Sequence, residues 1–185
     1  EKAAEKYNSV VVQSAKNQVD KVFRVNVISG GDPLEIYTDR EGEVIFKKYS
    51  PIGELSGFAA QYAETLHKTC SLSVVICDRD AVIACSGVPK KEYADKSLSD
   101  ELEGIINSRA LYVHRDGDEK LPVLSDGGTA HYVRCAMPII SEGDIIGCVA
   151  SVESTDETQE AHLNSDVEIK LIQTAAGFLG RQLEN

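Results

Sequence analysis

The spacing of apolar residues changes near residue 50, where a helix is predicted to begin. From there, apolar side chains recur every three to four positions, the spacing of a helix with one buried stripe. The members of this stripe are Ile52, Leu55, Phe58, Ala59, Tyr62 and Leu66. Pro51 suits the first helical position, and Ser50 before it can cap the helix. The pattern predicts one helix of roughly 17 residues.

Beyond this helix the apolar residues follow the period of two that is typical of strands. The predicted strands are residues 72–77, 81–86, 109–114, 131–140 and 145–152. The polar turn Asp78-Arg79-Asp80 joins the first two strands, and the turn at 141–144 joins the last two. The sequence therefore predicts an antiparallel sheet built largely from hairpins.

Two segments have the Ser-x-x-acid form of a capping box, which marks the start of a helix. One begins at Ser97 and precedes a short helix with apolar residues at 102, 105 and 106. The other runs from Ser165 to Glu168 and opens a last amphipathic helix. The apolar face of that helix is Ile172, Ala175, Ala176, Leu179 and Leu183. Amphipathic helices thus open and close residues 51–185, which makes this segment an α+β domain.

The first fifty residues form a separate predicted domain. Strands are expected at residues 9–13, 34–37 and 43–46, and a turn at 39–42 joins the last two into a hairpin. So short a segment with few large apolar side chains makes a marginal core. We therefore expect residues 1–50 to be a small β domain that gains stability by dimerising.

Small residues occupy four positions of the last helix and permit close approach of another helix. They are Ala175, Ala176, Gly177 and Gly180. We expect the flanking helices, at 51–67 and 166–184, to pair with the same helices of a second copy. The alternative is that the small residues face the domain's own sheet.

Charge is distributed unevenly between the two predicted domains. The net charge is −11, and residues 1–50 contribute zero while residues 51–185 contribute all of it. The acidic segment would repel a phosphate backbone, so any contact with DNA must come from residues 1–50. No apolar run approaches the roughly 18 residues that cross a bilayer, and we expect a cytoplasmic protein with no membrane attachment.

The cysteines and histidines do not have the spacing of a metal site. None of the five cysteines, Cys70, Cys77, Cys85, Cys135 and Cys148, lies two residues from another, and four lie in apolar, strand-like runs where reduced cysteine acts as a small hydrophobe. The histidines, His67, His114, His131 and His162, are scattered. The chain also lacks a P-loop and a dinucleotide fingerprint. We expect no metal site, no disulfide framework and no cofactor.

Two groups of motifs carry a family resemblance. The string from Gly31 to Tyr49 resembles the second half of an AbrB-type swapped-hairpin DNA-binding domain. Together with Ser50-Pro51-Ile52-Gly53-Glu54-Leu55, Val75-Ile76-Cys77-Asp78-Arg79-Asp80 and Ala175-Ala176-Gly177-Phe178-Leu179, it resembles sporulation transcription factors whose C-terminal domain is of the GAF type. The resemblance implies a regulator of late forespore genes, in which intertwined N-terminal dimers bind DNA and the GAF-type domains join dimers into tetramers. It also implies that the protein is not an enzyme.

The first thirty residues depart from the pattern of that family. Of the basic residues that the family places there, only Arg24 and Lys2 remain, and Lys16 lies in the string that replaces the family's Gly-Arg-Val-Val-Ile-Pro. Arginine offers a planar fork for phosphates and guanine edges that other side chains cannot supply. Arg24, Lys2 and Lys16 are the candidate DNA-binding residues. The alternative is a sensor or scaffold that does not bind DNA.

The resemblance to GAF domains also suggests a small-molecule pocket between the sheet and the loops on its far side. The candidate lining residues are Cys85, Ser86, Tyr112, Tyr132 and Arg134. Two alternatives remain for this domain. It could serve only to build the tetramer, or it could be a thiol reductase, because some GAF-type domains reduce free methionine sulfoxide with a cysteine thiolate.

Overall fold

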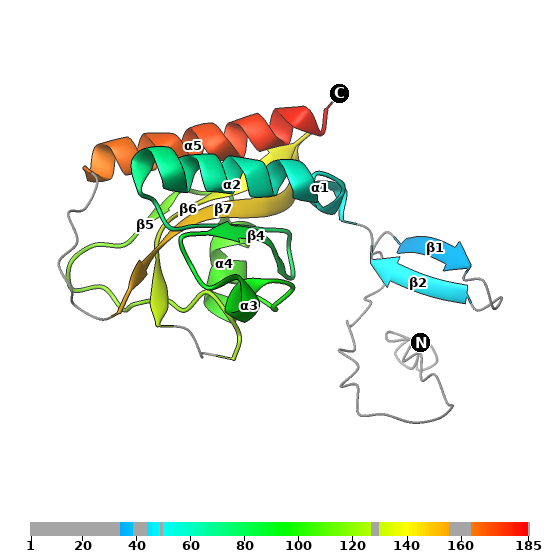
Figure 1. Ribbon diagram of the computed structural model, residues 1–185, viewed down its shortest axis with the longest axis horizontal. Coiled ribbons are helices and arrows are strands. Elements are labelled where there is room, and N and C mark those ends of the chain that lie inside the picture. The colour runs from blue at the N-terminus through cyan, green and yellow to red at the C-terminus, as the bar shows by residue number, and fades with distance from the viewer. Residues whose placement is uncertain (1–33, 39–43, 49, 127–129, 156–163, 185) are drawn as a thin grey trace, which may run out of the picture. The chain divides into compact units, whose positions relative to one another are not determined.

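The computed structural model describes residues 34–38, 44–48, 50–126, 130–155 and 164–184 (Figure 1). The chain divides into two compact units, Glu1–Tyr49 and Ser50–Asn185.

The described part of the first unit is an antiparallel hairpin. Strand β1 (Leu34–Thr38) pairs with β2 (Val44–Lys48), and Ile36 lies opposite Phe46. These strands confirm two of the predicted strands, whereas the one predicted at 9–13 lies outside the described residues. The side chain of Ile36 is 65% exposed and that of Leu34 is 38% exposed. Leu34 and Ile36 lie two positions apart on β1, so both exposed side chains are on the same face of the strand.

The second unit is built on a five-stranded antiparallel sheet with the order β4-β3-β7-β6-β5. Its strands are β3 (Val74–Cys77), β4 (Val82–Ser86), β5 (Tyr112–Val113), β6 (His131–Ser141) and β7 (Asp144–Ser154). Both predicted hairpins are confirmed. The strand predicted at 109–114 is only two residues long, because Arg109 has a left-handed φ of 58° and ends the preceding helix.

The predicted opening helix is divided in two. Helix α1 (Pro51–Glu54) is followed by α2 (Ser56–Cys70), and Leu55 between them has non-helical dihedral angles. Ser50 caps α1 as predicted, since its hydroxyl accepts a hydrogen bond from the N–H of Gly53 at 3.2 Å. Glycine is a poor helix former, and Gly53 and Gly57 on either side weaken the helix at this point.

The other two predicted helices are confirmed, but their caps are not the predicted residues. Helix α4 (Asp100–Ser108) is capped by Ser99 rather than Ser97, and α5 (Ser165–Gln182) is capped by Asn164 rather than Ser165. A short helix, α3 (Lys90–Tyr93), was not predicted. The last residue of the second predicted capping box, Glu168, is turned to the protein interior instead.

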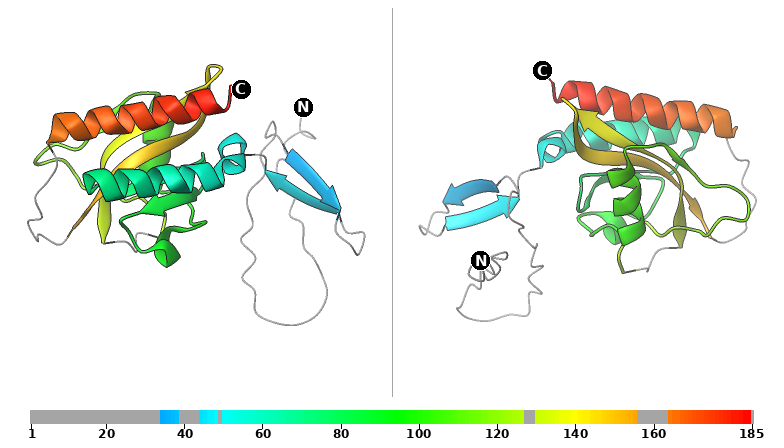
Figure 2. Two further views of the ribbon diagram at one scale, coloured as in Figure 1. Left: turned by 45° about the horizontal axis from the view of Figure 1, so that its top comes forward. Right: turned by 180° about the vertical axis from the view of Figure 1, so that it is seen from behind.

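The sheet has a core on each face. Helices α2 and α5 lie side by side over one face, here called the helix side, whereas α3, α4 and the loops near them cover the other, here called the loop side (Figures 1 and 2). Ala175, Ala176 and Gly180 are buried against the sheet on the helix side. Three of the four small residues assigned to pairing between copies therefore pack within the domain, which is the alternative left open by the sequence.

Candidate functional site

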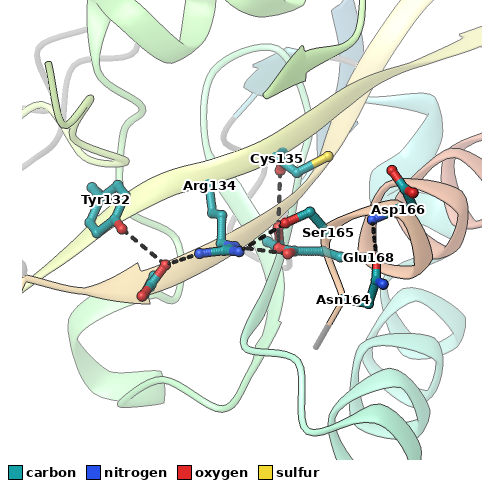
Figure 3. Close-up of polar contacts among 9 residues, drawn as sticks. Tyr132, Arg134, Cys135, Asn164, Ser165, Asp166 and Glu168 are labelled. Atoms are coloured by element: carbon teal, nitrogen blue, oxygen red, sulfur yellow. Dashed lines mark hydrogen bonds and ion pairs between the residues drawn. The ribbon is translucent and has the colours of Figure 1, made fainter. Parts of the chain in front are cut away.

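A network of charged side chains lies where α5 begins against the sheet (Figure 3). Arg134 of β6 is at its centre. Its Nη1 donates a hydrogen bond to Oε2 of Glu153 on β7 at 2.6 Å, and its Nε donates to Oε2 of Glu168 on α5 at 2.8 Å. The second oxygen of Glu168 accepts a hydrogen bond from the hydroxyl of Ser151 at 2.6 Å. The network thus joins two strands to the first turns of a helix.

A β-bulge explains why Arg134 reaches both carboxylates. Val133 pairs with Val152 and Cys135 with Ser151, so Arg134 is the extra residue of β6 and has no partner position on β7. Bulges bend a strand and redirect a side chain. On β7, Ser151 and Glu153 lie two positions apart and therefore share a face of the strand.

The network also includes Tyr132, whose hydroxyl donates to Oε2 of Glu153 at 2.9 Å. Burial and the hydrogen bond to this carboxylate raise the pKa of Tyr132 to about 12. Burial alone would lower the pKa of Arg134, but its hydrogen bonds to Glu168 and Glu153 outweigh this effect and raise it. Arg134 therefore stays charged, and with two carboxylates the network has a formal charge of −1.

This arrangement is suited to holding elements together. Each guanidinium edge of Arg134 that bonds a carboxylate is unavailable to an anionic ligand, and the side chain of Glu168 is only 4% exposed. Burial of a carboxylate is costly unless it is paired and hydrogen-bonded, and Glu168 is both. The network therefore connects the start of α5 to β6 and β7 and holds the helix against the sheet.

The five predicted pocket residues do not gather at one place. Cys85 is buried in the core of the loop side, where Tyr112 also packs, whereas Arg134 bonds to α5 on the helix side. Cys85 and Ser86 lie on β4 and Tyr112 lies on β5, at opposite edges of the sheet, about 19 Å apart at the usual strand spacing. Only Tyr132 and Arg134 are brought together, through Glu153.

Glu168, Glu153 and Ser151 were not predicted from the sequence as site residues. One signal was available, because Glu168 lies four positions before Ile172 and therefore continues the apolar stripe of the last helix. A single acid within such a stripe indicates a buried, paired carboxylate. Arg134, the partner of Glu168, could not be predicted in the same way, because the bulge at Arg134 does not change the pattern of apolar residues along β6.

The strand cysteines are placed as core residues. Cys77, Cys85, Cys135 and Cys148 are buried and are not in disulfides. A hydrogen bond with Cys148 and burial raise the pKa of Cys77, and burial raises those of Cys85 and Cys135, the latter to about 12. Because the thiolate is the reactive form, these environments disfavour the chemistry of a thiol reductase.

Several features bear on other kinds of site. In the described segments, no three side chains of histidine, cysteine, aspartate or glutamate are grouped to hold a metal ion. Over the same segments, no helix is both long and apolar enough to pass through a bilayer. The candidate DNA-binding residues Arg24, Lys2 and Lys16 lie outside the described residues.

Comparison with solved structures found several similar chains. The GAF domain of the nutrient sensor CodY from Clostridium difficile is 18% identical, with 67% of this chain and 83% of that chain covered and a TM-score of 0.43. A type II free methionine-R-sulfoxide reductase from Thermoplasma acidophilum is 11% identical, with 70% and 94% covered and a TM-score of 0.45.

Comparison with known sequences is more specific. The family described as "Stage V sporulation protein T C-terminal, transcription factor" matches residues 54–184. Stage V sporulation protein T of Bacillus subtilis (strain 168) is 45% identical over 166 residues, which cover 89% of this chain and 88% of that protein. Both matches extend over most of the chain, so the chain belongs to the stage V sporulation protein T family.

Proposed function

We propose that this protein is a DNA-binding transcriptional regulator of sporulation genes that acts in the forespore cytoplasm as a homotetramer. The identity of 45% over 89% of the chain carries this proposal. A match of that extent in a chain of 185 residues must begin no later than about residue 21, and so it includes the β1–β2 hairpin. The relationship therefore extends beyond the C-terminal domain into the segment expected to bind DNA.

The structure of the first unit supports the proposed dimerisation. An isolated two-stranded hairpin is marginally stable in water. The exposed Ile36 and Leu34 on the β1–β2 hairpin leave apolar surface that a second copy of the same hairpin would cover. An intertwined dimer of residues 1–50 supplies this cover and places two copies of Arg24, Lys2 and Lys16 on one assembly.

The charge distribution supports DNA contact by residues 1–50 rather than by residues 51–185. Residues 51–185 carry the whole net charge of −11, and their potential opposes a phosphate backbone. We infer that the C-terminal domain senses a small molecule, builds the tetramer, or does both. Coupling between the two units requires a ligand that binds two arrangements of the tetramer unequally.

The outer surface of α2 and α5 is the proposed contact between dimers. Phe178 of α5 is 39% exposed, and its ring lies 5.6 Å from the rings of Phe58 and Tyr62 on α2. Aromatic side chains are enriched at the centres of protein interfaces. This contact uses the outward residues of the two helices, since Ala175, Ala176 and Gly180 face the sheet.

The proposal is tested by fluorescence anisotropy with a promoter fragment that carries operator sites of this family. Binding should weaken steeply with salt through counterion release, and Arg24→Ala should weaken it further. Arg79→Ala is the matched control, because Arg79 is an exposed arginine in the acidic domain and should leave affinity unchanged. Absence of binding even at low salt would instead support a sensor or scaffold that has lost DNA binding.

The sensing part is tested separately. Candidate metabolites are added to the full chain, and DNA affinity and sedimentation coefficient are measured. A metabolite that changes both would support a ligand-controlled tetramer. If the assembly forms and binds DNA but no metabolite changes either quantity, the C-terminal domain acts only as an assembly module.

A further inference from the structure

We propose that α5 is held in a single position along the sheet by a lock with two parts. The first part is polar and consists of Glu168 with Arg134 and Ser151, and the second is steric and consists of Gly180 against Ile140. We call this arrangement the register lock, where register means the position of α5 along its own axis. The part of this inference that concerns assembly of the tetramer rests on the function proposed above.

The apolar contacts of α5 favour one register but do not act alone. Its buried residues on the helix side recur at 172, 175, 176 and 179, a repeat of three to four positions. A slide by one turn, roughly 5.4 Å, would keep apolar side chains over the sheet, but it would exchange a large residue such as Ile172 with a small one such as Ala176. Helices that slide past packed neighbours favour such one-turn steps. A polar contact and a steric contact add to the selection of one position.

The polar part selects a position because Glu168 is the one acid inside this stripe. Its side chain is 4% exposed, and its carboxylate accepts hydrogen bonds from Nε of Arg134 at 2.8 Å and from the hydroxyl of Ser151 at 2.6 Å. A one-turn slide would leave this charge buried without partners, which is strongly destabilising. Buried ion pairs add little to stability compared with apolar packing, and specifying register is their best-attested role.

The steric part acts about three turns later on the same helix. A Cβ atom at position 180 would collide with the carbonyl oxygen of Ile140. A slide by four residues in either direction would place Ala176 or Glu184 at this point, and both carry a Cβ. The close approach of α5 to β6 therefore excludes both four-residue slides, whereas a slide by three residues would bring Gly177 to this point.

The lock determines where the outer side chains of α5 lie. In this register the ring of Phe178 is stacked at 24° to that of Tyr62 and lies 5.6 Å from the ring of Phe58. A slide by one turn would move Phe178 away from both rings. Arg134 is thus a positioning residue for the surface proposed to join dimers, although the structure places it on the sheet rather than on that surface.

The experiment uses the full chain labelled with fluorophenylalanine, which gives reporters at its four phenylalanines. The double variant Arg134→Met with Glu168→Leu replaces the ion pair by apolar side chains, a change that buried pairs often tolerate without unfolding. We expect the resonances of Phe58 and Phe178 to shift or split, while that of Phe46 stays unchanged. Assignment comes from Phe178→Leu and Phe58→Leu.

The matched control is Glu64→Leu with Lys68→Met. This pair is also a Glu with a basic residue, at 2.6 Å on α2, but both side chains are more than half exposed. It should leave all four resonances unchanged. A folded Arg134→Met, Glu168→Leu variant with the wild-type spectrum would overturn the proposal.

A second measurement applies if the double variant does not fold. Glu168→Gln keeps the shape of the side chain but removes its charge. We expect hydrogen exchange in the first two turns of α5 to rise at least tenfold, while exchange in α4 stays the same. Equal exchange in α5 of variant and wild type would refute the lock.

Sedimentation velocity separates the lock from the proposed assembly. If the Phe178 resonance changes and the tetramer weakens, the lock positions the assembly surface. A changed resonance with an intact tetramer supports the lock and refutes its role in assembly. A wild-type protein that forms no tetramer refutes the proposed function without affecting the fluorine result.

Discussion

The two sides of the sheet are covered in different ways. On the helix side, α2 and α5 run over the sheet, and α5 is fixed by named contacts at both ends: Glu168 bonds to the strands near its start, and Glu184 beyond its end accepts a hydrogen bond from the N–H of Glu142 at 3.3 Å. On the loop side, α4 has nine residues and α3 has four, and loops supply the rest of the cover.

This difference shows two ways of closing a core. The loop side is filled by large apolar side chains such as Tyr93, Leu98 and Leu102, all buried, which fit because their short elements can adjust to one another. The helix side uses a rigid element whose position must be selected, and it therefore contains a buried ion pair and a glycine contact. Substitutions of the same kind on the two sides should therefore have unequal costs.

The largest expected effect is a difference in how well the two sides of the sheet can close a cavity left by a truncated side chain. Ile172→Ala on the helix side should lower the free energy of unfolding by about 4 kcal/mol, and Leu102→Ala on the loop side by about 3 kcal/mol. Both residues are fully buried, but α5 is held at its ends and cannot close the cavity. Urea denaturation measures both values. A larger loss for Leu102→Ala would reverse the comparison.

The next effect tests the glycine contact of the helix side. Gly180→Ala should cost about 2 to 3 kcal/mol, because the added methyl group would collide with the backbone of Ile140. Gly177→Ala is the matched control on the same helix, since a Cβ there meets nothing within 4 Å. It should stabilise the protein by about 0.5 to 1 kcal/mol through helix propensity. Thermal or urea unfolding distinguishes the two, and equal effects would show that α5 is free to move off the sheet.

A smaller effect compares the helix caps. Ser99→Ala should cost about 2 kcal/mol, because the buried hydroxyl of Ser99 serves both the N–H of Leu102 and the carbonyl of Pro122. Asn164→Ala at the exposed start of α5 should cost about 1 kcal/mol, since water replaces the lost acceptor. Urea denaturation again provides the measurement. Loss of a helix cap should therefore destabilise the loop side more than the helix side. Equal losses for Ser99→Ala and Asn164→Ala would contradict this expectation.

The smallest effect is a pH dependence in the Arg134 network. Because the pKa of Tyr132 is raised from 10.0 to about 12, its contribution to stability is complete below pH 10 and is lost as the pH rises from 10 to 12. Tyr132→Phe removes this loss. The free energy of unfolding of the wild type should therefore fall by about 1 kcal/mol relative to that of Tyr132→Phe between pH 9 and pH 11. A difference that stays constant over this range would show that Tyr132 titrates normally.

The parts of the fold that depend on periodic apolar residues could be predicted from the sequence. Both hairpins of the sheet and the helices at 100–108 and 165–182 were confirmed, because period and turn chemistry mark them directly. Helix caps were predicted less well, since several polar residues near a helix start compete for the same role. Asn164 caps α5, which leaves Glu168 free to turn inward.

The polar network could not be assembled from sequence because it depends on a bulge and on the meeting of segments far apart in the chain. Arg134 and Tyr132 were singled out, but as pocket residues, and their partner Glu153 is 19 residues after Arg134. The predicted pocket combined residues from several strands, although the order of these strands in the sheet could not be predicted from the sequence. That order separates Cys85 from Tyr112 by the full width of the sheet.

The position of α5 in the chain has a consequence for synthesis. Every strand that α5 covers precedes it in the chain, so during synthesis residues such as Ile139 and Val149 are made before the helix that covers them. At synthesis rates of about 5 to 20 residues per second, the interval between the end of β7 and the appearance of Ile172 is roughly one to four seconds. During this time the apolar surface is open to chaperones and to other nascent chains.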